Sequence, residues 1–197
     1  MKSAAIDEVI LHLARLPGIG ERTATRLAFY LLRASPQFRE KLAESLKALS
    51  QVSFCSNCRT LTEESPCRIC ASPVRKPELL CVVEKPSDIY PIERLGKYNG
   101  TYFVLHGLLS PLEGVGPDEI GLQLLFDRVS RQRPEELILA LNPTVEGEAT
   151  VSYVAQKLSN EPVQLSRLAS GLPMGSELEF ADQITLGKAF EGRTKLR

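Results

Sequence analysis

The sequence predicts an α/β protein with a helical amino-terminal region, a small four-cysteine motif, a mainly parallel sheet with flanking helices and a carboxy-terminal extension. Three observations support this fold class. Apolar residues recur with helical spacing through residues 5–50. Four cysteines form two close pairs within residues 55–70. Beyond them, short apolar runs alternate with helix-like segments, which is typical of parallel strands joined by helices.

Length and composition are ordinary for a globular protein. The chain has 197 residues, of which 43% are hydrophobic and 24% charged, enough for one large domain or two small ones. Its first residues, MKSAAIDEVILHLARL, include Asp7, Glu8 and His12. These polar residues argue against a secretory signal and a membrane span. We therefore expect a cytoplasmic protein without membrane contact.

The charge is unevenly distributed along the chain. Residues 1–77 contain 12 Lys and Arg against 7 Asp and Glu, whereas residues 78–197 contain 12 against 17. A basic front part favours a surface for a polyanion. Solvated charged faces give the same imbalance, so charge alone does not decide between the two readings.

Residues 1–52 are expected to be helical. Segments 5–16 and 21–34 have helical spacing, and a third helix is expected over 38–50. The third helix carries one apolar stripe, made of Phe38, Leu42, Leu46 and Leu49.

The turn LPGIG (16–20) separates the first two helices. Its glycines permit a tight turn, and the helix that follows has an apolar face opposite an arginine face. Free N–H groups at a helix start, beside guanidinium groups, can hold a phosphate without reading a base. The stretch resembles the helix-hairpin-helix motif of proteins that bind DNA without sequence specificity; an ordinary helical turn with solvated arginines is the alternative. The resemblance implies DNA contacts at Gly18, Gly20, Arg22 and Arg26.

Residues 53–77 contain the pattern C-x2-C-x8-C-x2-C. Two thiolate pairs brought together by a short hairpin suit a tetrahedral zinc site, and four protein ligands leave no position for a catalytic water. We therefore expect one structural Zn²⁺ per chain. Disulfides and redox chemistry are the alternatives, although cytosolic thiols stay reduced. The expected ligands are Cys55, Cys58, Cys67 and Cys70; Cys81 is expected to be a small buried hydrophobe.

Residues 78–168 are expected to form the sheet, and residues 169–197 a carboxy-terminal segment. The sequence has no GxxxxGK[ST] motif, so it does not support nucleotide hydrolysis through a P-loop. Strands are expected at 79–83, 101–105, 136–141 and 163–168, and helices at 87–95, 117–131 and 147–159.

Acidic residues follow two of the expected strands. Glu84 ends the first strand, and the loop LNPTVEGE (141–148) ends the third. Open α/β sheets bind ligands at such strand ends, and carboxylates placed there could hold Mg²⁺. An ordinary strand-to-helix turn with exposed acids is the alternative.

The loop resembles that of Toprim domains, in which a strand-terminal Glu is followed by strand-DPDxEGE-helix. Asn142 and Thr144 occupy the two Asp positions. Neutral oxygens cannot replace two anionic magnesium ligands, so the loop is expected to lack phosphoryl-transfer chemistry. The matching residues are Glu84, Glu146, Gly147 and Glu148.

The order of these parts resembles the RecR family of bacterial recombination mediators over essentially the whole chain. The resemblance implies a DNA repair protein without turnover that works with RecO, and with RecF, to load RecA onto single-stranded DNA coated by single-strand-binding protein. It also implies a homo-oligomer, with a tetrameric ring as one form, and an acidic partner surface at Glu84, Glu146 and Glu148. The alternative is a Mg²⁺-dependent Toprim enzyme, either a nuclease or a topoisomerase.

Overall fold

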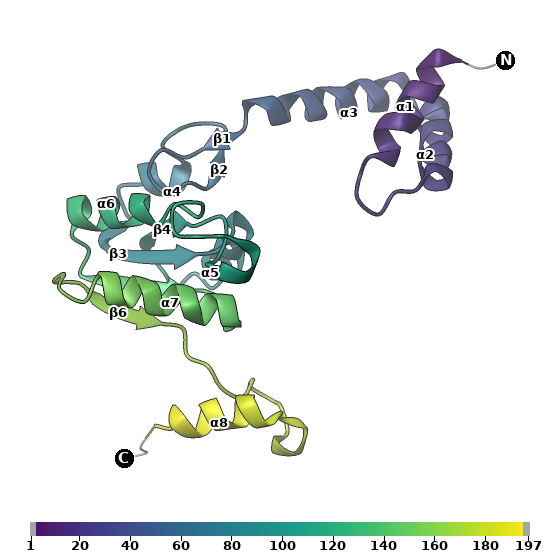
Figure 1. Ribbon diagram of the computed structural model, residues 1–197. Helices are drawn as coiled ribbons and strands as arrows, with labels where there is room; N and C mark the ends of the chain where they lie inside the picture. The colour runs from purple at the N-terminus through teal and green to yellow at the C-terminus, as the bar shows by residue number, and fades with distance from the viewer. Residues whose placement is uncertain (1–2, 195–197) are drawn as a thin grey trace. The chain divides into compact units, whose positions relative to one another are not determined.

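The chain divides into two compact units, Met1–Val52 and Ser53–Arg197. They are seen in a computed structural model that describes residues 3–194. Figure 1 shows the course of the chain and labels most of its helices and strands. The boundary between the units falls just ahead of the cysteine-rich stretch, so the helical region and the rest of the chain are described separately.

The first unit consists of helices α1 (Ala4–Ala14), α2 (Glu21–Arg33) and α3 (Pro36–Ala48), followed by the short turn η1 (Leu49–Gln51). Helices α1 and α2 pack against each other. The two residues of α2 that are buried are both alanines, whose small side chains let two helices approach closely. They are Ala24 and Ala28.

Helix α3 begins with a clear capping signal. Ser35 accepts a 3.2 Å hydrogen bond from the Phe38 N–H, and Pro36 occupies the first turn, where its missing N–H costs nothing. Arg39 joins α3 to the end of α2, because its guanidinium donates to the Ala34 carbonyl at 2.6 Å. The expected apolar stripe of α3 is exposed within the single chain: Phe38, Leu42, Leu46 and Leu49.

The second unit opens with a small antiparallel hairpin and one turn of helix. The hairpin strands are β1 (Ser53–Phe54) and β2 (Leu61–Thr62), and the helix is α4 (Arg68–Ala71). With strands of two residues, this segment buries little besides its cysteines. Its stability therefore has to come from something other than an apolar core.

A four-stranded parallel sheet follows. Its strand order is β4-β3-β5-β6. Val83, the last residue of β3, pairs with the last residues of both neighbouring strands, Val104 and Ala140. The residues that follow these three strands therefore meet at one edge of the sheet. The strands are β3 (Lys76–Val83), β4 (Gly100–Val104), β5 (Glu136–Ala140) and β6 (Gln164–Arg167).

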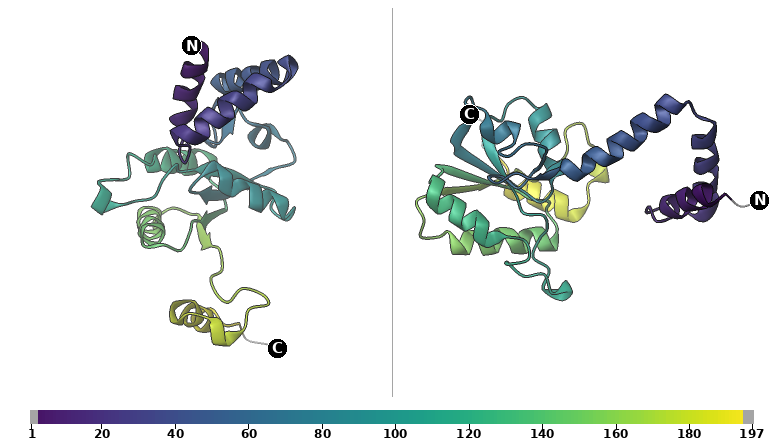
Figure 2. Two further views of the ribbon diagram at one scale, coloured as in Figure 1. Left: turned by 90° about the vertical axis from the view of Figure 1, so that its right-hand side faces the viewer. Right: turned by 90° about the horizontal axis from the view of Figure 1, so that it is seen from above.

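Helices lie on both faces of this sheet (Figure 2). Alternate strand residues such as Leu80 and Val82 pack against α6 (Leu122–Gln132) and α7 (Val145–Lys157), while Cys81 and Val83 pack against α5 (Ile89–Arg94). Cys81 is buried, as expected. The helix expected over 117–131 starts later, at Leu122, because Gly121 adopts a positive φ of 68°. Short turns η2 (Pro86–Asp88) and η3 (Pro111–Glu113) complete the connections.

The carboxy-terminal segment contains the turn η4 (Leu178–Phe180) and helix α8 (Gln183–Glu191). Asp182 starts α8 by accepting hydrogen bonds from the backbone N–H groups of Ile184 and Thr185. Of the helices in residues 3–194, none has the length and apolar character needed to cross a bilayer.

Candidate functional site

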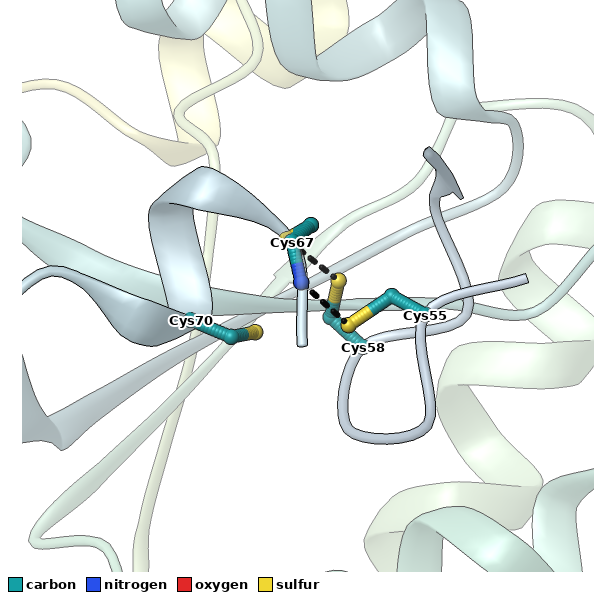
Figure 3. A group of neighbouring side chains, drawn as sticks. All are labelled: Cys55, Cys58, Cys67 and Cys70. Carbon is teal, nitrogen blue, oxygen red and sulfur yellow. Dashed lines mark hydrogen bonds between the residues drawn. The ribbon is translucent and has the colours of Figure 1, made fainter. Parts of the chain in front are cut away.

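The four paired cysteines come together between the β1–β2 hairpin and α4 (Figure 3). Their sulfur atoms all lie within 4.8 Å of one another. The hairpin turns tightly here because the Arg59 N–H donates to the Cys55 carbonyl at 2.9 Å. Within residues 3–194, no other group of three or more His, Cys, Asp or Glu side chains is close enough to share a metal ion.

The surroundings of these thiols suit a cation that binds thiolates. Burial alone raises the pKa of Cys55, but N–H groups of Cys67, Cys58 and Asn57 outweigh burial and lower that pKa to about 6. Burial raises the pKa of Cys67 to about 11. Without a cation, the mutual repulsion of thiolates would oppose ionisation of the whole set, whereas Zn²⁺ binds four of them. None of the described cysteines forms a disulfide, so the donor set fits zinc.

The zinc motif (residues 53–72) covers the open edge of the sheet. Strand β4 is an edge strand, and its Val104 N–H donates to the Cys58 carbonyl at 2.9 Å. Arg59 donates to the carbonyl of Leu105 at 3.3 Å, and the His106 ring contacts the Arg59 carbonyl at 2.7 Å. The motif thus satisfies the Val104 N–H, which an edge strand would otherwise leave open, and it contacts the two residues that follow β4.

The turn between α1 and α2 leaves hydrogen-bond donors free. Gly18 has a φ of +79°, which favours glycine. Gly20 starts α2 without a side-chain cap, so the first N–H groups of the helix lack the usual side-chain acceptor. Arg22 and Arg26, four residues apart on this helix, are exposed and form no ion pair with any described residue. This arrangement can bind a phosphate.

At the carboxyl edge of the sheet, Glu84 faces an amide where a metal site would place an acid. The Asn142 side chain donates a hydrogen bond of 3.3 Å to the Glu84 carboxylate, and Lys85 forms an ion pair with it at 3.0 Å. The Glu84 side chain is only 12% exposed. Its charge is therefore balanced by protein groups.

The loop is shaped by Thr144 and Gly147. Thr144 caps α7 by accepting a 3.1 Å hydrogen bond from the Gly147 N–H. A Cβ at position 147 would collide with the Asn142 carbonyl, so only glycine allows this close approach. The cap places Glu146 and Glu148 in the first turn of α7, where the helix dipole favours acids.

The two acids of this turn have different surroundings. Glu148 forms ion pairs with Arg167 at 2.9 Å and with Lys188 of α8 at 3.3 Å. Lys188 first, and then Arg167, hold the pKa of Glu148 below its ordinary value. Glu146 is exposed and has no ion-pair partner in residues 3–194. The three acids therefore do not form one uncompensated negative surface.

Comparison with known proteins matches each part of the chain. Residues 6–49 match the family model described as RecR, helix-hairpin-helix, and residues 52–72 match the RecR zinc finger domain of the four-cysteine type. Residues 78–169 match the Toprim domain, and residues 171–194 match RecR, C-terminal. Together these matches run through nearly the whole chain in the expected order.

Curated relatives match along their full length. Recombination protein RecR of Thermobifida fusca is 46% identical over 197 residues, covering 100% of this chain and 99% of the relative. Recombination protein RecR of Hydrogenovibrio crunogenus is 48% identical over 194 residues, which is 98% of each chain. The corresponding Anaeromyxobacter protein is 46% identical over 192 residues, 97% of each. The chain belongs to the RecR family.

RecR proteins are non-catalytic mediators of recombinational repair, so the predicted function class is confirmed and the Toprim-enzyme alternative is set aside. The prediction of one structural zinc ion is confirmed by the match to the RecR zinc finger and by the clustering of the sulfurs. The roles of individual residues in DNA and partner binding remain predictions.

Several residues that build the site in this RecR-family chain were not predicted from the sequence. Arg59 and Arg128 fasten the zinc motif to the sheet, and Arg167 and Lys188 neutralise Glu148. Arg59 directly follows the first cysteine pair, and this position could have indicated a role at the zinc motif. The other three lie far in sequence from the groups that they contact, and no local pattern marks them.

Proposed function

We propose that this RecR-family chain binds DNA without sequence preference and loads RecA onto single-stranded DNA coated by single-strand-binding protein, together with a RecO-like partner and RecF. The DNA-binding part of this proposal rests on Arg22 and Arg26, exposed and without ion-pair partners among the described residues, beside the uncapped start of α2. Phosphates accept hydrogen bonds from guanidinium and N–H groups whatever the base. Gly18 and Gly20 shape the turn that presents these donors.

The zinc ion is assigned to Cys55, Cys58, Cys67 and Cys70. Four thiolates close the coordination shell, so the ion is structural. We further divide the chain into a DNA-binding region (1–52), the zinc-binding segment (53–77), the Toprim part (78–168) and a carboxy-terminal segment (169–197).

The partner surface is proposed at the carboxyl edge of the sheet, at Glu84, Glu146 and Glu148. Glu146 is the main contact in this proposal, because the other two carboxylates already have cationic partners. A basic patch on a RecO-like protein is complementary to this edge, and such complementarity raises the association rate. Bare DNA would be repelled by the same acid.

We also propose that the chain works as a homo-oligomer in the bacterial cytoplasm, with a tetrameric ring as the first form to test. Support comes from an apolar groove of about 470 Å³ between α1, α2 and α3. The groove is lined almost entirely by apolar side chains, including Val9, Leu32 and Leu46, which are exposed in the single chain. Surfaces of this kind usually mark protein contacts.

The test combines DNA binding with RecA loading. The purified chain is added to single-stranded DNA coated with single-strand-binding protein, with and without a RecO protein, and RecA filament formation is measured. We expect loading that requires both proteins and fails when Arg22 and Arg26 are changed to Glu. RecA loading by RecO alone at the same rate would overturn the proposed role. Mass measurement in solution decides the oligomeric state.

A further inference from the structure

Arg128 is a buried cation without an acidic partner. It lies on α6, is 7% exposed, and forms no ion pair with any carboxylate in residues 3–194. A buried charge is costly unless an opposite charge compensates it. Arginine does not escape this cost by losing its proton, because its pKa is too high.

All three nitrogens of the Arg128 guanidinium are hydrogen-bonded, but to neutral groups. It donates to the carbonyls of Asn57 and Tyr102, both at 2.7 Å, to the Thr101 hydroxyl at 3.2 Å and to the Gln132 amide oxygen at 3.0 Å. These four bonds use four of its five N–H donors, and they tie α6, strand β4 and the zinc motif together. They do not cancel its charge.

The compensating charge lies in the cysteine cluster. Asn57, whose carbonyl accepts from Arg128, sits between the ligands Cys55 and Cys58. Four thiolates around Zn²⁺ carry a net charge of about −2. The 2.7 Å hydrogen bond to the Asn57 carbonyl therefore holds the guanidinium beside the loop that carries both Cys55 and Cys58.

We propose that Arg128 is the counter-ion of the zinc–thiolate centre, so that zinc loading and docking of the zinc motif on strand β4 are one coupled event. The inference rests on zinc ligation by the four cysteines and assigns Arg128 a positioning role. With zinc bound, the anionic centre stabilises the buried guanidinium, and the guanidinium stabilises the anionic centre. Without zinc, mutual repulsion keeps the four sulfurs from all being thiolates, so Arg128 loses part of its compensating charge and its bridge to Asn57 and Tyr102 weakens.

The first test measures zinc affinity by competition with a chromophoric chelator. Arg128→Met removes the charge at similar length, Arg128→Lys keeps it, and Arg131→Met changes an exposed arginine on the same helix as the matched control. We expect Arg128→Met to bind zinc at least about tenfold more weakly, which is the size of effect seen for groups that support metal ligands. Arg128→Lys should lie between Arg128→Met and the parent, and Arg131→Met should match the parent.

Equal affinities in Arg128→Met and the parent would overturn the proposal, as would equal losses in Arg128→Met and Arg128→Lys.

A second comparison changes the charge of the zinc site itself and then repeats the Arg128 substitution. Cys70→His retains a four-ligand zinc site but lowers its negative charge by one. In the Cys70→His variant, Arg128→Met should weaken zinc binding by a smaller factor than it does in the parent. An undiminished factor would contradict the counter-ion role. Failure of the parent itself to bind zinc would instead refute the ligand assignment.

The second test uses the unmodified protein and does not depend on how the variants fold. Hydrogen exchange is followed at the Val104 amide, which donates to the Cys58 carbonyl, before and after zinc removal. We expect Val104 to lose most of its protection without zinc, while amides of the central strand β5 keep theirs. Retained protection at Val104 in the zinc-free protein would show that docking does not depend on the metal.

Discussion

The side chain of Asn142 donates a hydrogen bond of 3.3 Å to the carboxylate of Glu84 across the carboxyl edge of the sheet. In a magnesium site both positions would present oxygen atoms to the ion. Here an amide donor meets the acid directly, and Lys85 contributes a positive charge 3.0 Å from the same carboxylate. The polar partners of the Glu84 carboxylate are thus an amide and an ammonium group of this chain.

Restoring the two missing acids should create affinity for divalent ions. In Asn142→Asp with Thr144→Asp, Asp retains the capping role at 144, because Asp is also a good helix cap. We expect the double variant to bind Mn²⁺ or Mg²⁺ much more tightly than the parent does, as measured by calorimetry. Adding Glu84→Gln should abolish the gain. Equal binding by the parent and the double variant would show that the position of the acids, and not their number, is limiting.

Removing zinc should loosen the zinc motif. Structural zinc sites contribute on the order of 10 kcal/mol to folding of their segment. Cys58→Ser or chelation should therefore make residues 52–77 sensitive to protease, with Cys81→Ser as the control for loss of a thiol outside the cluster. Metal analysis should find one zinc per chain in protein purified without chelators. Thiols found as disulfides, with no zinc, would contradict the assignment.

Reversing the charge of Arg22 and Arg26 should weaken DNA binding equally for all sequences. Each phosphate contact contributes about 0.9 to the slope of log affinity against log salt on duplex DNA, so the slope should fall by about 2. The matched control is Arg94→Glu with Lys97→Glu, the same charge change at exposed residues of the second unit. A loss restricted to one base sequence would argue against phosphate contacts.

Glu146→Lys should weaken binding of a RecO-like partner and RecA loading, while folding and zinc content stay unchanged. Because exposed complementary charges act mainly on association, we expect a lower on-rate that depends less on salt. Glu161→Lys, an exposed acid in the loop after α7, is the control. Unchanged partner association in Glu146→Lys would place the surface elsewhere.

Lys188→Glu should release α8 from the Toprim part, since it places a second negative charge opposite Glu148. Hydrogen exchange over residues 183–191 measures the release, with Lys97→Glu as the control. The pH dependence has a defined sign. Lys188 and Arg167 lower the pKa of Glu148, so these ion pairs are present above the ordinary glutamate pKa of about 4.3 and are lost as the pH falls through the lowered value. Docking of α8 that persists in acid would show that apolar contacts hold it.

The strands and the metal cluster were predictable because their signals are local. Val82 and Val83 lie in an apolar run that a doubly covered parallel strand requires, and paired cysteines have few uses in a reducing compartment. Helix α8 was not predicted, because it is short and its residues have weak amphipathic spacing. The helix starts at Asp182, and the hydrogen bonds by which Asp182 caps it can be recognised only in the structure.

The sequence also did not predict which charged residues are buried or form ion pairs. Arginine is normally exposed, so nothing in the sequence around Arg128 indicates that it is buried between β4 and the zinc motif. Glu148 looked like part of an acidic surface because its partners, Arg167 and Lys188, are distant in sequence. The apolar stripe containing Leu42 lies where it was expected, but the structure leaves it exposed, which its spacing alone did not indicate.

The covered edge of β4 has a consequence for handling and expressing the protein. An uncovered edge strand offers unpaired N–H and C=O groups on which strands of other molecules can add, and this is a common route to aggregation. Two of those groups on β4 are taken: the Val104 N–H donates to the zinc motif, and the Tyr102 carbonyl accepts from the Arg128 side chain. Cells grown with too little zinc should therefore accumulate this chain in inclusion bodies, even though the sheet itself contains no metal ligand.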